Sequence, residues 1–216
     1  MKEKRAVLIG ATGLVGNALL RHLLSIDLYD AVFALVRRDL NCEHERLVRH
    51  IVNFNRLEDH RGLFAVDDVF CCLGTTKAKA GSREAFRIVD YDYPVRASRI
   101  ARSMGARRFF IVTAIGARPD SPFFYNRVKG EVEREIASAG FEATHIFRPS
   151  LLLGERAERR PGEDFAQFMA PLMRLVMRGP LRDYLPVRAE DVARAMVRAA
   201  GGSAGGVVIH ESREFH

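Results

Sequence analysis

A glycine-rich segment near the start of the chain has the residue types and spacing that suit phosphate binding. It reads Gly10-Ala-Thr-Gly13-Leu-Val-Gly16, follows an apolar run of strand length and opens a segment with helical leucine spacing. Gly10 permits the tight turn, Gly13 lets the backbone approach a pyrophosphate, and Gly16 lets helix and strand pack closely. Amides at the helix N-terminus then attract the phosphate charge. We therefore expect a dinucleotide site formed by Gly10, Thr12, Gly13, Leu14, Val15 and Gly16.

Two consecutive arginines, Arg37 and Arg38, end the next apolar run, about 20 residues beyond the glycine turn. An NAD-specific site places an acidic residue there, whereas an NADP site places arginine near the 2′-phosphate. A guanidinium forms paired hydrogen bonds with phosphate and stacks on adenine. We expect NADP(H) as the preferred cofactor, with NAD(H) possible, and assign the phosphate first to Arg37, with Arg38 as helper. The alternative interpretation is two solvated loop charges.

The elements that position these residues alternate between strand and helix. Helical apolar spacing covers Arg83–Met104, ended by Gly105, and Phe124–Ala139, ended by Gly140. This alternation predicts an α/β fold of Rossmann type, a doubly wound, mainly parallel sheet of about seven strands with helices on both faces. The predicted strands are Ala6–Ile9, Ala31–Val36, Ile51–Phe54, Asp68–Leu73, Phe109–Thr113, Thr144–Phe147 and Val207–His210.

The composition is typical of a soluble globular protein. Hydrophobic residues make up 48% and charged residues 28% of the 216 positions, which suits a single domain over residues 1–216. No run approaches the roughly 20 apolar residues of a spanning helix, and the first residues lead into the glycine turn instead of a signal peptide. We therefore expect a cytoplasmic protein without a membrane partner.

The net charge of +7 is compatible with nucleic acid, an anionic cofactor or a general preference for arginine. The basic residues fall in small groups interrupted by acids, without a long Lys/Arg run, which disfavours nucleic-acid binding. The three cysteines and seven histidines lack the spacing of a disulfide framework or a metal site, so we expect no metal.

Five stretches spread over nearly the whole chain carry a resemblance to a known family. With its Tyr125-Asn-Arg-Val-Lys129 segment, the sequence resembles the short-chain dehydrogenase/reductase superfamily. More narrowly, it is similar to small atypical members of the Tat-interacting-protein oxidoreductase-like family, which is related to NAD-dependent epimerases and dehydratases. The stretches are Gly10–Gly16, Phe70–Thr76, Phe123–Glu131, Phe147–Gly154 and Pro186–Ala193.

The resemblance implies three catalytic residues. Tyr125 is the general acid/base, and Lys129, one helical turn later, holds the nicotinamide ribose. Residues i and i+4 share a helix face, and a nearby ammonium favours the phenolate. Thr113 matches the serine or threonine near the end of the preceding strand, whose hydroxyl donates to a substrate carbonyl; the next position is Ala114.

The same resemblance implies further cofactor contacts. Pro149 and Ser150 are expected near the nicotinamide carboxamide. Asn53 stands where an adenine-contacting aspartate is common, and its alternative interpretation is a strand-end cap. The residues at the end of the fourth strand, Leu73, Gly74 and Thr75, are expected to lie along the cofactor.

Two functions remain open on these residues. The first is an NADP(H)-dependent oxidoreductase that moves hydride to or from a small carbonyl or alcohol, with 154–186 as a substrate-side or lid insertion. The second is a non-catalytic NADP(H)-binding protein that acts in regulation or redox sensing through protein partners. Only 66 residues follow Ser150, which disfavours a large nucleotide-sugar substrate. A homodimer is possible.

Overall fold

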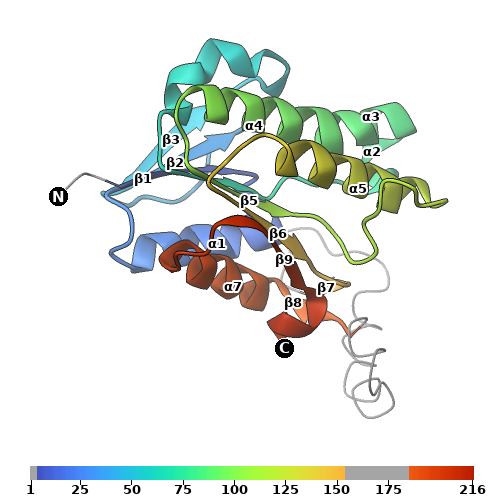
Figure 1. Ribbon diagram of the computed structural model, residues 1–216. Coiled ribbons are helices and arrows are strands. Elements are labelled where there is room, and N and C mark those ends of the chain that lie inside the picture. Colours follow the sequence, from blue (N-terminus) through green and yellow to red (C-terminus); the bar gives the residue numbers. More distant parts are fainter. Residues whose placement is uncertain (1–3, 154–184) are drawn as a thin grey trace.

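The computed structural model describes residues 4–153 and 185–216 of the chain. Its centre is a seven-stranded sheet in which every neighbouring pair is parallel, in the order β3-β2-β1-β4-β5-β6-β9 (Figure 1). The predicted Rossmann-type α/β fold is confirmed. The strands are β1 Arg5–Ile9, β2 Ala31–Val36, β3 Leu47–Ile51, β4 Asp68–Cys71, β5 Arg108–Val112, β6 Ala143–Arg148 and β9 Gly206–Glu211.

Helices cover both faces of this sheet (Figure 1). On one face, Ala6 and Leu8 of β1 join a core with α1 (Leu14–Ser25) and α7 (Ala189–Gly201). On the other face, Val7 and Ile9 join a core with the remaining large helices. Successive strand residues point to opposite faces, so a strand buried on both sides is apolar throughout. The helices of the second face are η1 (Phe54–Phe64), α4 (Tyr93–Ser103) and α5 (Phe124–Ala137).

The chain reverses its direction across the sheet between β1 and β4. From β1 it proceeds outward to β2 and β3, and then crosses to β4 on the other side of β1. Ile9 pairs with Cys71 at the carboxyl ends of these strands. Ligands of doubly wound sheets bind outside the carboxyl ends at such a switch point, so the glycine turn after Ile9 lies where a dinucleotide site is expected.

Two predicted elements differ from the structure. The strand expected at Ile51–Phe54 lies earlier, at Leu47–Ile51, because it is an edge strand with polar exposed residues. The apolar residues Val52 and Phe54 instead lie after the strand and at the start of η1, where both are buried in the core of the second face. The helix expected over Arg83–Met104 is divided into α3 (Arg83–Arg87), a π-helical turn η2 (Ile88–Asp92) and α4.

Several smaller features complete the fold. Gly105 and Gly140 have φ values of +90° and +79°, as expected for residues that end helices. Of the proposed insertion 154–186, residues 154–184 lie outside the described residues. The remaining elements are α2 (Lys77–Ala80), β7 (Leu152–Leu153), β8 (Val187–Arg188) and η4 (Ser212–Phe215).

Within the described ranges, none of the helices has the length and apolar character needed to span a membrane. The same ranges hold no group of three or more His, Cys, Asp or Glu side chains placed to bind a metal ion. All three cysteines are free thiols.

Candidate active site

The glycine turn has the close contacts that its sequence predicts. Gly10 has φ +89°, and a Cβ there would lie 2.6 Å from the Cys72 carbonyl oxygen after β4. A Cβ on Gly16 would lie 2.1 Å from the Gly10 carbonyl oxygen. Only glycine therefore fits at either position, and the absence of both side chains brings strand, turn and helix together.

The N-terminus of α1 is open at this turn. Gly13 precedes the helix, is exposed, and donates its N–H to the Gly10 carbonyl at 3.0 Å. Among the described residues, no side chain caps the helix. The next amides of this 12-residue helix are therefore free to receive an anion, and the exposed Thr12 lies beside them. These features fit a pyrophosphate.

Arg37 and Arg38 follow β2, next to the glycine turn that follows β1. Both side chains are exposed, and neither has a hydrogen bond or ion pair with another described residue. Asn53 lies after β3 and caps η1, with its side-chain oxygen accepting the Asn55 N–H at 3.0 Å. The arginines are thus available to a phosphate, whereas the Asn53 side chain has the capping role that was its alternative interpretation.

Lys129 of α5 reaches the loop that follows β4. Its side chain is buried, and Nζ lies 2.8 Å from Asp90 Oδ1 of η2. A Cβ built on Gly74 would be 3.8 Å from the same Nζ. The second Asp90 oxygen accepts the Thr75 N–H at 2.9 Å. Since Gly10 approaches Cys72 in this loop, the lysine and the glycine turn both lie against one short segment.

The charge of Lys129 is held in place despite burial. Burial alone lowers the pKa of an ammonium, but the neighbouring Asp90 and Tyr125 outweigh it and raise the pKa of Lys129 above its usual value. Burial raises the pKa of the Cys71 thiol, which lies nearby in β4, to about 11. The site therefore contains a charged lysine and a neutral cysteine at neutral pH.

Tyr125 begins the same face of α5, one turn before Lys129. Its ring is half-buried and packs against Phe86 of α3, with 5.6 Å between ring centroids. Phe124 packs on the same Phe86 ring at 5.7 Å, and the neighbouring Phe123 is 72% exposed. The tyrosine thus has a fixed ring beside an aromatic surface.

Thr113 does not have the substrate-facing position expected for it. Its hydroxyl donates to Glu133 Oε1 at 2.5 Å and lies 3.3 Å from the Phe147 carbonyl oxygen. Glu133 lies eight residues after Tyr125 in α5, about 12 Å along the helix axis. A buried ion pair with Arg148, 2.6 Å away, fixes Glu133 there. The Thr113 hydroxyl therefore binds a carboxylate two helical turns beyond Tyr125. It makes a structural hydrogen bond instead of the predicted contact with a substrate carbonyl.

Pro149 and Ser150 lie at the carboxyl end of β6 and are held by internal hydrogen bonds. The Pro149 carbonyl accepts the Ile115 N–H at 2.9 Å. The Ser150 N–H donates to Ser212 Oγ at 3.2 Å, and its hydroxyl donates to the Leu185 carbonyl. Both residues lie at the carboxyl edge of the sheet, and the Pro149 carbonyl and the Ser150 N–H are already paired within the protein.

Asp90 is a site residue that the sequence analysis missed. It lies four residues after Phe86, on the buried side of a segment with helical apolar spacing, and is 1% exposed. An aspartate at an inward-facing helical position requires a partner, and this requirement could have indicated that Asp90 belongs to a site. The sequence did not reveal that the partner was Lys129, 39 residues away.

Comparison with known proteins identifies relatives of nearly the full chain. Protein HTATIP2 of Rattus norvegicus is 37% identical over 171 residues, which cover 77% of this chain and 70% of the relative. Protein FMP52, mitochondrial, of Eremothecium gossypii is 38% identical over 199 residues, 90% of this chain and 88% of the relative. The chain belongs to the HTATIP2/FMP52 family. No family model matches the sequence.

Solved structures with the same fold as this HTATIP2/FMP52 family member include an enzyme in complex with NAD+ and a nucleotide-sugar epimerase. Bordetella bronchiseptica WbmH in complex with NAD+ has a TM-score of 0.72 at 17% identity, covering 97% of this chain and 75% of that chain. A Thermotoga maritima UDP-glucose 4-epimerase with UDP-glucose has 0.72 at 13% identity, covering 96% and 76%. At these identities the likeness concerns the fold.

The expected cytoplasmic location is contradicted by the family. The Saccharomyces cerevisiae and Eremothecium gossypii relatives are both named mitochondrial proteins. The expectation relied on the absence of an apolar signal segment, whereas mitochondrial transit peptides are amphipathic and rich in arginine. The composition of this family member therefore does not support an exclusively cytoplasmic location.

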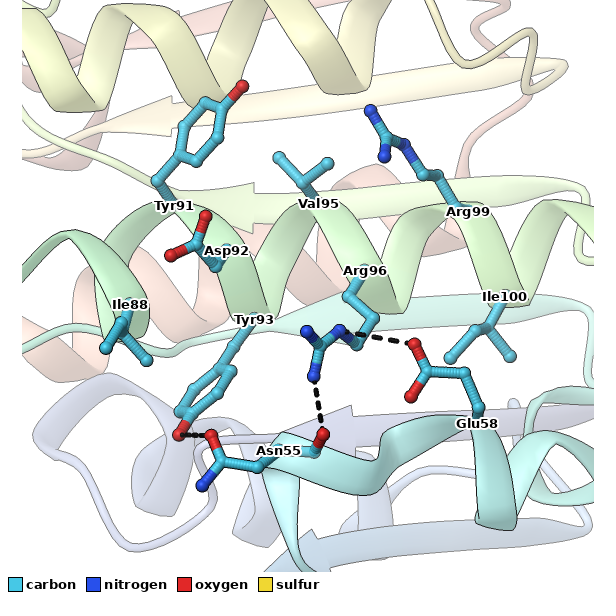
Figure 2. Close-up of a pocket in the computed structure, with 10 residues that line it drawn as sticks. All are labelled: Asn55, Glu58, Ile88, Tyr91, Asp92, Tyr93, Val95, Arg96, Arg99 and Ile100. Carbon is cyan, nitrogen blue, oxygen red and sulfur yellow. Dashed lines mark hydrogen bonds and ion pairs between the residues drawn. The ribbon is translucent and has the colours of Figure 1, made fainter.

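A groove of about 600 Å³ lies elsewhere, between α4 and η1 (Figure 2). The Tyr93 hydroxyl donates to Asn55 Oδ1 at 2.8 Å, and Arg96 pairs with Glu58 at 3.2 Å. None of the residues assigned to cofactor or catalysis lines this groove. The candidate site of this HTATIP2/FMP52 family member therefore remains at the carboxyl edge of the sheet.

Proposed function

We propose that this protein is an NADP(H)-dependent oxidoreductase that moves hydride to or from a small carbonyl or alcohol. The observation that carries the proposal is the placement of the Lys129 ammonium, one helical turn from Tyr125, against the loop that contacts the glycine turn. The backbone proposed to bind phosphate and the proposed acid/base pair thus lie at one sheet edge. The NAD+ complex of the structural neighbour WbmH supports a dinucleotide as the cofactor.

The cofactor contacts follow from the fit described above. The open N-terminus of α1 would receive the pyrophosphate, and Arg37, with Arg38 beside it, would pair with a 2′-phosphate. When bound, the nicotinamide supplies or accepts the hydride. The exposed positions of both arginines, with no described partner, support NADP(H) as the preferred form.

The proton is handled by Tyr125. Its hydroxyl would donate a proton to the carbonyl oxygen during reduction and accept one during alcohol oxidation. The ammonium of Lys129 on the same helix face favours the ionised tyrosine and would also bind the nicotinamide ribose. Phe123 and Phe124 beside it would favour an apolar substituent on the substrate.

Calorimetric titration with NADPH and NADH tests the cofactor part of this proposal. We expect tighter binding of NADPH, and R37A should remove that preference, a loss of about 2 kcal/mol for a charge-assisted phosphate contact. The matched control is R198A, which removes an exposed arginine in the last turn of α7. Binding of neither nucleotide by the wild-type protein would overturn the proposal.

One observation favours a second candidate, an NADP(H)-binding regulatory or redox-sensing protein. Thr113, which would orient the substrate, is engaged by Glu133. Y125F and R37A distinguish the two functions in a cellular assay of whatever process the protein affects. An effect that survives Y125F but not R37A would assign the function to cofactor binding without turnover.

A further inference from the structure

Asp90 lies in an irregular turn of a helical segment. The helical segment between β4 and β5 contains one π-helical turn, η2, which holds Asp90. Such turns insert an extra residue into a helix and are frequent at functional sites. Asp90 is 1% exposed, so its carboxylate needs compensating partners.

Those partners come from two different elements. Oδ1 is 2.8 Å from Lys129 Nζ of α5, and no other donor of the described chain reaches that oxygen. Oδ2 accepts the Thr75 N–H at 2.9 Å, from the loop after β4. One carboxylate therefore fixes both the lysine and the cofactor-side loop, and it makes the lysine part of a pair with no net charge.

We propose that Asp90 is a positioning residue that compensates the charge of Lys129, and so sets the pH range of proton transfer and the balance between oxidised and reduced cofactor. This inference rests on the proposed function. An uncompensated ammonium favours the Tyr125 phenolate and disfavours a cationic nicotinamide ring. Pairing with Asp90 weakens both effects, so the oxidised cofactor is retained and proton transfer operates at higher pH.

Few other ionisable groups of residues 4–153 and 185–216 face this pair. Tyr125 approaches Lys129 along α5, and Cys71 approaches from β4. Burial raises the pKa of Cys71 to about 11, so that this thiol carries no charge at neutral pH. The Asp90 carboxylate is thus the counter-charge that determines the local field.

The test uses D90N, because the Asn oxygen retains the acceptor for the Thr75 N–H while the charge is removed. Calorimetry with NADP+ and NADPH should show NADP+ binding weakened about tenfold relative to NADPH, as expected for the loss of one nearby charge. In steady-state assays the pH optimum of carbonyl reduction should move down by about one unit. NMR of 13C-labelled lysine should show Lys129 losing its proton at lower pH than in the wild type.

K129M provides a second variant that does not depend on D90N being folded. It removes the opposite charge, so the ratio of NADP+ to NADPH affinity should shift in favour of NADP+. The matched control is E142Q, which removes an exposed carboxylate before β6, at the opposite edge of the sheet, and should leave the ratio unchanged.

The outcomes separate this inference from the proposed function. If the wild-type protein binds neither nucleotide, the proposed function fails and the inference fails with it. If the wild type binds and the ratio is unchanged in both D90N and K129M, the inference alone is overturned. Opposite shifts of the ratio in the two variants would establish it.

Discussion

The hydroxyl of Thr113 donates a 2.5 Å hydrogen bond to Glu133, on the helix face that also holds Tyr125 and Lys129. Glu133 in turn pairs with Arg148, which also binds Glu211 at 3.1 Å. A largely buried network thus joins α5 to the carboxyl ends of β5 and β6. The members of this network stabilise the fold. The chemistry is assigned to Lys129 and Tyr125, one and two helical turns before Glu133 in α5.

Replacing Thr113 tests this division of roles. T113V removes a hydrogen bond to a buried carboxylate and should lower the free energy of unfolding by about 2 kcal/mol, with turnover of the folded protein within about twofold of wild type. Urea unfolding and steady-state assays measure the two quantities. T113S keeps the hydroxyl and is the control. A stable T113V protein with turnover reduced a hundredfold would restore the catalytic interpretation.

The glycines of the turn should separate binding from folding. G16A places a Cβ 2.1 Å from the Gly10 carbonyl oxygen and should strongly lower the melting temperature. A Cβ on Gly13 lies 3.3 Å from the same oxygen, a contact that a small shift relieves. Gly13 is also the residue at which the backbone is proposed to approach the pyrophosphate. G13A should therefore remain folded and lose NADPH affinity. Normal NADPH binding by G13A would contradict the assigned pyrophosphate position.

A buried ion pair at the amino edge of the sheet should affect stability alone. Arg108 contacts both oxygens of Asp68, at 2.7 and 2.5 Å, and Asp68 is 1% exposed. D68N leaves Arg108 without its counter-charge and should lower the free energy of unfolding by about 3–5 kcal/mol. Denaturant unfolding measures this loss.

The controls for D68N are of two kinds. E142Q breaks the exposed Arg107–Glu142 pair at the same edge and should change stability little. NADPH affinity of folded D68N, measured by calorimetry, should match the wild type, because the pair lies at the opposite end of the strands. Loss of NADPH affinity in folded D68N would show that the two edges are coupled.

His145 should make the protein sensitive to acid. Its buried ring stacks on Phe110, and Nδ1 lies 3.1 Å from His210 Nε2. Burial, followed by the charges of His210 and Arg108, lowers the pKa of His145 to about 4, an effect that Asp68 partly opposes. The unfolded chain therefore binds more protons between pH 6.5 and 4, and stability is lost as pH falls through this range.

The H145F variant isolates this contribution. Between pH 7 and pH 5, the wild type should lose about 2 kcal/mol more stability than H145F, which keeps a stacked ring without a titrating group. Urea unfolding at the two pH values gives the difference. Equal acid sensitivity of the two proteins would assign the loss to other groups.

The sequence alone determined the fold class and the geometry of the glycine turn. Both depend on local patterns, since strands buried on two faces are apolar throughout and a tight turn against a helix accepts only glycine. The edge strand β3 was misplaced because exposure on one side removes the apolar pattern on which its prediction depended. The π-turn was missed because its apolar spacing resembles that of a continuous helix.

Tertiary structure decided which polar groups meet in the site. Tyr125 and Lys129 were predictable together because four residues separate them on one helix. Asp90 and Lys129, by contrast, are brought together by packing of η2 against α5, and Thr113 and Glu133 by packing of β5 against the same helix. The direction of each polar side chain, and which of several polar groups it pairs with, depend on how these elements pack. The spacing of residues along the chain does not specify this packing.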